Sequence, residues 1–291
     1  MLTTLISAEQ LAAQLRNEVS QKNLVIVDCR HDLMDAQAGK NAYDAGHIPS
    51  AIFANLDSDL SGSKYDADGV FAGRHPLPKV DDLLQTLRHF GINNDTQVVA
   101  YDAHGGMFAA RLWWLLRSIG HASVAVLDGG IGAWTANGNP LQTEAAQNSV
   151  GNIALRPTLT KQVNVHDVLN NLSASSELQH QVIDARAADR FRGENETIDP
   201  VGGHIPGAKN RFFKDNLQAD GRFKSAQQLR QEWLDLITEP SKSIMQCGSG
   251  VTACHNLLAM EVAGLSGAAL YPGSWSEWCA DAKRPVASGS Q

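Results

Sequence analysis

Short apolar runs alternate with longer amphipathic stretches along the chain. Runs such as "LVIVD" (24–28) and "QVVAYD" (97–102) are mostly apolar and contain three and two β-branched residues. This is typical of strands that are buried on both faces. The stretches between the runs carry apolar residues at helical spacing. The helices predicted in this way cover residues 7–19, 80–91, 109–120, 164–172, 226–237 and 252–264.

Strands that alternate with helices predict a parallel sheet, because two parallel strands need a crossover connection that is usually a helix. The remaining predicted strands lie at 123–129, 181–184, 243–247 and 268–273. The fold class is therefore α/β, with helices on both faces of each parallel sheet.

The two halves of the chain repeat one another. Four pairs of segments match in the same order, which indicates a duplicated domain. The pairs are "VIVDCR" with "VIDAR", "GHIPSA" with "GHIPGA", "ADGVF" with "ADGRF", and "GGIGAW" with "GSWSEW". We expect one domain over 1–140, a linker over 141–160 where the pattern breaks, and a second domain over 161–291.

Composition narrows the function classes only slightly. The chain has 291 residues, 43% of them hydrophobic, and a formal net charge of -7, which argues against a general nucleic-acid binder. No apolar run is long enough to span a bilayer, and the first residues do not resemble a secretory leader, so we expect a cytoplasmic protein. Four cysteines in so long a chain do not make a disulfide framework, and none has zinc-ligand spacing, so no metal is predicted.

The stretch "MQCGSGVTAC" (245–254) carries the chemistry. Cys247 stands at the end of a predicted strand, where open parallel sheets bind ligands. Gly248 and Gly250 permit positive φ and close ligand approach, and Thr252 is expected to cap the following helix. The backbone N–H groups of such a turn form an anion-binding nest that favours a nucleophilic thiolate.

A cysteine in a backbone cradle is also found in phosphatases, in the pattern C-x5-R. Here the sixth residue after Cys247 is Ala253. A phosphate dianion would lack the arginine that binds it in a bidentate manner, so a phosphatase is set aside.

The loop "CGSGVTAC" resembles the active-site loop of the rhodanese superfamily, in the form typical of 3-mercaptopyruvate sulfurtransferases. The "DxR", "GHIPGA" and "GSWSEW" segments resemble that family too, and the likeness covers nearly the whole chain. It implies two tandem rhodanese-like domains. Asp102 stands where the first half would have its cysteine, and a carboxylate cannot carry sulfane sulfur. The first domain is therefore expected to be catalytically silent.

The resemblance also implies a relay of Ser249, His75 and Asp57 that assists proton transfer. His75 lies in "AGRHPLP" (72–78), near about six extra residues of the first half, since the repeat offset is 152 at "ADGVF" and 146 at "DDLL". Because these extra residues belong to the silent half, we expect a site shared between the two halves.

Substrate binding is assigned by the same resemblance to Arg190, with the loop residues Gly248, Gly250, Val251 and Thr252. A guanidinium suits a planar carboxylate. Mercaptopyruvate sulfurtransferases usually have a second arginine shortly before "GHIPG", but residues 193–203 contain no lysine or arginine. Arg192 and the pair Asp184–Arg186 are interpreted as structural, as are Cys254 and Cys279.

The implied function is a sulfurtransferase that moves sulfur from 3-mercaptopyruvate to a thiol, a thioredoxin-like protein or cyanide through a Cys247 persulfide. No cofactor, nucleic acid or membrane is expected to take part. Two alternatives stay open: a thiosulfate:cyanide sulfurtransferase, and a non-catalytic rhodanese module that binds sulfur species.

Overall fold

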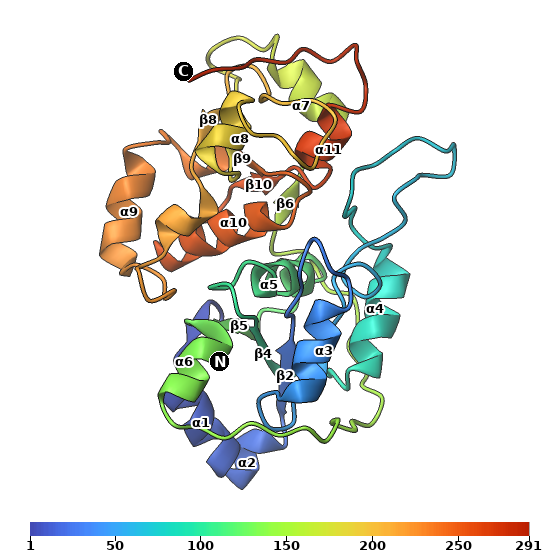
Figure 1. The fold of residues 1–291 in the computed structure, drawn as a ribbon, viewed down its shortest axis with the longest axis vertical. Helices are drawn as coiled ribbons and strands as arrows, with labels where there is room; N and C mark the ends of the chain where they lie inside the picture. Colours follow the sequence, from blue (N-terminus) through green and yellow to red (C-terminus); the bar gives the residue numbers. More distant parts are fainter. Residues whose placement is uncertain (291) are drawn as a thin grey trace. The chain divides into compact units, whose positions relative to one another are not determined.

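The computed structural model describes residues 1–290, which form two compact units (Figure 1). Unit 1 comprises residues 1–61, 78–159 and 217–223. Unit 2 comprises residues 62–77, 160–216 and 224 onward. Each unit therefore includes one short segment from the other half of the chain. The domain boundaries expected from the sequence, which ignore these two segments, stay a prediction.

Unit 1 is built on a parallel five-stranded sheet with the order β1-β5-β4-β2-β3. Its strands are β1 (Leu5–Ile6), β2 (Leu24–Asp28), β3 (Ile52–Phe53), β4 (Gln97–Tyr101) and β5 (Val124–Leu127). Its helices are α1 (Ala8–Arg16), α2 (Glu18–Gln21), α3 (Ala38–Ala45), α4 (Val80–His89), α5 (Ala109–Ser118) and α6 (Gly130–Ala136).

Unit 2 repeats this topology, with the strand order β6-β10-β9-β7-β8. Its strands are β6 (Lys161–Gln162), β7 (Gln181–Asp184), β8 (Lys209–Asn210), β9 (Ser243–Gln246) and β10 (Ala269–Leu270). Its helices are α7 (Val165–Asn171), α8 (Ala188–Arg192), α9 (Ala226–Leu234), α10 (Thr252–Val262) and α11 (Ser274–Trp278), with 3₁₀ turns η1 (Phe213–Asn216) and η2 (Pro240–Lys242). The central strand β9 thus corresponds to β4.

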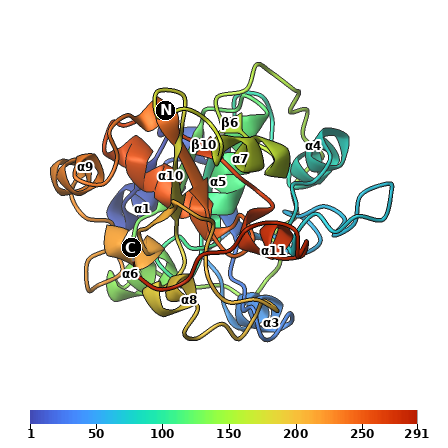
Figure 2. The same ribbon diagram turned by 90° about the horizontal axis from the view of Figure 1, so that it is seen from above.

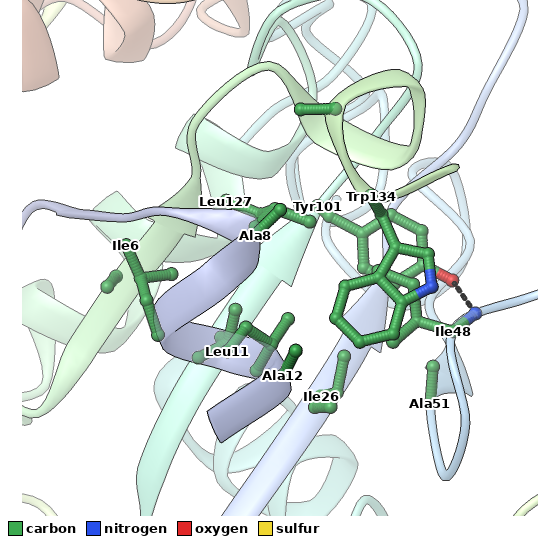
Figure 3. Packing of buried hydrophobic residues seen from close by; sticks show 13 residues of the cluster. Ile6, Ala8, Leu11, Ala12, Ile26, Ile48, Ala51, Tyr101, Leu127 and Trp134 are labelled. Carbon is green, nitrogen blue, oxygen red and sulfur yellow. Dashed lines mark hydrogen bonds between the residues drawn. The ribbon is translucent and has the colours of Figure 1, made fainter. Parts of the chain in front are cut away.

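Helices cover both faces of each sheet, as expected from the sequence. In unit 1, α1 and α6 pack on one face around Ile26, Val99 and Trp134 (Figure 3). The intervening strand residues point to the opposite face, where α5 packs against β4 and β5. In unit 2, α10 lies against β9 and β10 (Figures 1 and 2), and α7, α8 and α11 lie on the other side.

The predicted helix over 7–19 is interrupted in the structure, because α1 ends at Arg16 and a separate helix, α2, begins at Glu18. Ser7 caps α1 in a capping box with Gln10, but the helix ends at Arg16 because Asn17 has an extended backbone. The two-residue edge strands β1, β3, β6 and β8 were not predicted, since two residues carry no readable periodicity. No helix among residues 1–290 is long and apolar enough to cross a membrane.

The repeated "DxR" and "GHIP" segments are joined by hydrogen bonds inside each unit. In unit 1 the Arg30 guanidinium donates to both carboxylate oxygens of Asp28 and to the carbonyl oxygen of Gly46. The Tyr101 hydroxyl donates to Asp28 and accepts from the backbone N–H of Ile48 (Figure 3). This network fixes the carboxyl end of β2 beside that of β4.

Unit 2 contains the same arrangement. Arg186 donates to both oxygens of Asp184 and to the carbonyl oxygen of Gly203. Asp184 is fully buried, and the side chain of Arg186 is 1% exposed. The ion pair expected for Asp184 and Arg186 is therefore confirmed.

The Asp28–Arg30 pair makes a stability prediction. Replacing Arg30 by Met leaves the Asp28 carboxylate buried without its cation, which should lower the free energy of unfolding by about 3–5 kcal/mol. Urea denaturation followed by tryptophan fluorescence measures the change.

The matched control is Lys40→Met, which removes the exposed pair with Asp44. An exposed helix pair contributes only about 0.3–0.5 kcal/mol, so this variant should unfold almost as the wild type does. Equal losses in the two variants would contradict the importance of the buried pair.

Candidate active site

Cys247 directly follows β9 and leads into the turn before α10. The strand-to-helix turn expected from the sequence is thus present, with the thiol at the carboxyl end of the central strand. The residue is 2% exposed. Its Sγ atom lies 3.5 Å from the backbone nitrogen of Ser249, whose N–H donates to the sulfur. A backbone donor that faces the sulfur is the geometry needed to stabilise a thiolate or persulfide.

The start of α11 holds the turn from one side. The Ser274 hydroxyl accepts from the N–H of Cys247 at 3.0 Å. The backbone N–H groups of Trp275 and Ser276 donate to the carbonyl oxygens of Cys247 and Gly248, both at 2.9 Å. The repeated segment "GSWSEW" therefore fixes the backbone beside the thiol.

The two glycines of the turn play different parts. Gly250 has a φ of 74°, and a Cβ at this position would lie 2.2 Å from the carbonyl oxygen of Pro272, so only glycine fits. Gly248 does not have positive φ. Its Cα instead faces two guanidinium groups, since a Cβ there would lie 2.8 Å from Nη2 of Arg74 and 3.8 Å from both terminal nitrogens of Arg190.

The expectation that Thr252 caps α10 is wrong. Thr252 is the first residue of the helix, and Val251 stands at the cap position without a side-chain hydrogen bond to the helix. The turn reaches the helix in a tight bend at Gly250, which leaves Thr252 inside the first helical turn. Binding roles for Val251 and Thr252 stay a prediction.

Ser249 and His75 lie together. The Ser249 hydroxyl is 2.8 Å from Nδ1 of His75, and each residue is 6% exposed. Segment 62–77, which carries His75, belongs to unit 2. The contact joins residues separated by 174 positions in the sequence, and it is internal to the unit that contains Cys247.

Asp57 belongs to unit 1. It follows β3 in a turn, its backbone N–H donates to the side-chain oxygen of Asn55 at 2.8 Å, and its side chain is exposed. Its charge raises the pKa of His31, although burial lowers the pKa of that histidine overall. A role for Asp57 in the relay with His75 stays a prediction.

Arg190 lies in α8 and is bound to carboxylates. Its guanidinium donates to both oxygens of Glu196, at 2.8 and 3.1 Å, and lies 3.3 Å from Asp199. Burial tends to raise the pKa of Glu196, but the hydrogen bonds from Arg190 and from two backbone N–H groups outweigh it and hold that pKa below its usual value. Arg192, by contrast, forms an exposed pair with Glu194.

Arg74 is a residue of this site that sequence reasoning missed. It forms an ion pair with Asp199, and its guanidinium is the group closest to the Cα face of Gly248. The available signal was its place in "AGRHPLP" beside His75. Nothing in the local pattern distinguishes it from an ordinary loop arginine, because its partner is 125 residues away.

In the corresponding turn of unit 1, the side chain of Asp102 binds the backbone N–H groups of the turn. Asp102 directly follows β4 and is fully buried. Its carboxylate oxygens accept four backbone N–H groups of the turn, at 2.7–2.9 Å, from His104, Gly106, Phe108 and Ala109. The anion nest of unit 1 thus binds a built-in anion.

The other cysteines lie in packed surroundings. Cys254 is fully buried in α10, with its Sγ atom 3.3 Å from the carbonyl oxygen of Gly250. Burial raises the pKa of Cys279 to about 11 and that of Cys29 well above its usual value. Over residues 1–290, no group of three or more His, Cys, Asp or Glu side chains is placed to hold a metal ion.

Comparisons with known proteins identify the family of this chain. The family model "Rhodanese-like domain" matches residues 11–137 and 165–281. The chain is 44% identical to the "Probable 3-mercaptopyruvate sulfurtransferase" of Pseudomonas aeruginosa over 98% of both chains. It is 33% identical to the thiosulfate sulfurtransferase of Gallus gallus, over 94% of this chain and 92% of the relative.

Among solved structures, SseA from Escherichia coli, described in connection with 3-mercaptopyruvate sulfotransferases, superposes with a TM-score of 0.79 and 30% identity, covering 94% of this chain and all of SseA. The family match spans both halves, and the relatives align over more than nine-tenths of the chain. With a thiol at the end of β9 and a repeated parallel α/β scaffold, the chain belongs to the rhodanese family, and it has two rhodanese-like domains.

Proposed function

We propose that this protein is a 3-mercaptopyruvate sulfurtransferase that carries sulfur on Cys247. The observation that carries the proposal is the 2.8 Å contact between the Ser249 hydroxyl and Nδ1 of His75. Ser249 lies two positions after Cys247, in a turn that has no cationic side chain of its own. A hydroxyl paired with an imidazole can move a proton, which the reaction of mercaptopyruvate requires. Relatives named as mercaptopyruvate sulfurtransferases support the same donor.

In the first step the Cys247 thiolate attacks the sulfur of 3-mercaptopyruvate. A new S–S bond forms, the C–S bond breaks, and its electron pair remains on the carbon as the enolate of pyruvate. Protonation of that carbon yields pyruvate and leaves Cys247 as a persulfide. The N–H of Ser249, which already faces Sγ, stabilises the attacking thiolate, whose negative charge passes to the enolate as the C–S bond breaks.

The proton for the enolate comes through Ser249. Its hydroxyl gives up a proton as the C–S bond breaks, and His75 replaces it through the contact at Nδ1. Asp57 is proposed as the residue that orients the histidine. Arg190 binds the substrate carboxylate, and the backbone of Gly248 to Thr252 lines the sulfur site.

In the second step an acceptor attacks the outer sulfur of the persulfide. Cyanide leaves as thiocyanate, and a thiol or a thioredoxin-like protein takes the sulfur as its own persulfide, so that the Cys247 thiolate returns in a ping-pong cycle. The reaction is placed in the cytoplasm, which agrees with four cysteines that form no disulfide within the described chain. Unit 1, with Asp102 in place of the thiol, is proposed to be catalytically silent.

Thiosulfate is the second candidate donor. The observation that favours it is the pair of guanidinium groups of Arg74 and Arg190 next to Gly248, which can attract a dianion. A comparison of kcat/KM for the two donors decides between them. We expect mercaptopyruvate to be preferred, and a higher kcat/KM for thiosulfate would overturn this choice of donor.

Sulfur transfer should depend on one cysteine. Cys247→Ser should abolish turnover of either donor, because serine cannot form a persulfide, and intact-mass spectra of the donor-treated wild type should show one labile extra sulfur on Cys247.

Cys254→Ser and Cys279→Ser are matched controls that should retain most activity. With a pKa of about 11, the Cys279 thiol is almost entirely protonated at pH 8. Labile sulfur on Cys279, or full turnover by a Cys247→Ser variant, would contradict the mechanism. Either result would also exclude a catalytic role for the turn between β9 and α10.

The Ser249–His75 pair should act on one donor more than on the other. Ser249→Ala should lower kcat for mercaptopyruvate by about a hundredfold, since an acid–base contribution is lost, and affect thiosulfate much less because its leaving sulfite needs no carbon protonation. Steady-state kinetics with both donors measures the split. An equal loss for both would indicate a structural role for Ser249.

A further inference from the structure

Arg74 and Arg190 present two guanidinium groups to the same side of the Cys247 turn. A Cβ built on Gly248 would lie 2.8 Å from Arg74 and 3.8 Å from Arg190. The side chains of these arginines are 23% and 19% exposed, so each retains contact with solvent. A side chain at position 248 would collide with Arg74, so glycine allows both guanidinium groups to lie this close to the turn.

The position of Arg74 is tied to the turn. Its backbone N–H donates to the hydroxyl of Ser276 at 3.1 Å, and the backbone N–H of Ser276 donates to the carbonyl oxygen of Gly248 at 2.9 Å. Gly73, with a φ of 106°, passes so close to Gly273 that a Cβ would lie 2.9 Å from its carbonyl oxygen. One serine therefore anchors both the arginine and the backbone beside the thiol.

Asp199 bridges the two guanidinium groups. It forms ion pairs with Arg74 and with Arg190, and its side chain is 3% exposed. Burial raises the pKa of Asp199, while Arg74 and Arg190 act in the opposite direction. A buried carboxylate in this place competes with any incoming anion for the same N–H donors.

The charges around this bridge balance. Three arginines face three carboxylates in one connected set of ion pairs, which comprises Arg74, Arg186, Arg190, Asp184, Glu196 and Asp199. The formal sum is zero, so a bound monocarboxylate brings the set to -1 and a dianion to -2. Without Asp199 the set would start at +1, and a dianion would be far better compensated.

Building on the proposed function, we propose that Arg74 is a second substrate-binding guanidinium and that Asp199 selects singly charged donors. Arg74 supplies a cation that the segment before "GHIPG" lacks. Asp199 holds both arginines in place and repels the second charge of a dianion such as thiosulfate. Asp199 acts through the arginines, so it is a positioning residue, whereas Arg74 contacts the substrate.

Donor kinetics test both residues. Asp199→Asn should raise the ratio of kcat/KM for thiosulfate to kcat/KM for mercaptopyruvate by about tenfold or more. Arg74→Met should raise KM for mercaptopyruvate by about ten- to a hundredfold with little change in kcat, and Arg74→Lys should recover part of the loss. Glu194→Gln and Arg192→Met, from the exposed pair on and just after α8, are matched controls that should change neither quantity.

Two results would overturn the proposal: an Asp199→Asn variant with an unchanged donor ratio, or an Arg74→Met variant that behaves like Arg192→Met. Calorimetric titration of the wild type provides a test that needs neither a variant nor turnover. Pyruvate, a monoanion, should bind at least about tenfold more tightly than sulfate, a dianion of thiosulfate shape. Tighter or equal binding of sulfate would refute the charge selection.

The titration also separates this inference from the proposed function. If the wild type transfers no sulfur but binds pyruvate more tightly than sulfate, the proposed activity fails and the charge selection stands. If sulfur is transferred through Cys247 but Asp199→Asn leaves the ratio of kcat/KM for the two donors unchanged, the proposed activity stands and the role of Asp199 fails.

Discussion

The turn between β9 and α10 depends on a close approach of two backbones at Gly250. Any side chain there would collide with the carbonyl oxygen of Pro272, and its φ of 74° is one that L-residues rarely adopt. Because the turn lies so near the chain that enters α11, the first N–H groups of α11 reach the carbonyl oxygens of Cys247 and Gly248. These bonds fix the backbone from which the Cys247 thiol projects and the Ser249 N–H that faces it.

The two units show what a single position can change on a shared scaffold. Both have the buried Asp–Arg pair that binds a glycine carbonyl, and both end their central strand at a tight turn of backbone donors. In unit 1 the turn is filled by the Asp102 carboxylate, which accepts four of those donors. In unit 2 the backbone N–H of Ser249 donates to the Cys247 sulfur instead. The same scaffold thus places a carboxylate after the central strand of unit 1 and a thiol after that of unit 2.

The sequence predicted those features of the fold that depend on short, continuous stretches of residues. The long buried strands, the helices that follow them and the place of Cys247 depend on runs of ten to twenty residues. His75 was assigned through the resemblance to the family, and the change of the repeat offset showed that it lies near an insertion. Arg74 directly precedes His75 but was missed, because the residues that it contacts, Asp199 and Gly248, are far away in the chain. The end of α1 at Arg16 and the cap of α10 at Val251 were wrong because single backbone conformations, which propensity does not specify, decide them.

The membership of residues 62–77 in unit 2 also affects the order in which the protein can form. During synthesis this segment leaves the ribosome well before its partners, and His75 precedes Ser249 by 174 residues. At a synthesis rate of about 5–20 residues per second, Ser249 is added to the chain roughly 10–35 s after His75. The segment cannot make its contacts with Asp199, Ser249 and Ser276 until those residues have been synthesised. The contact between His75 and Ser249 is thus one of the later steps in the folding of unit 2, because it cannot form before Ser249 has been synthesised.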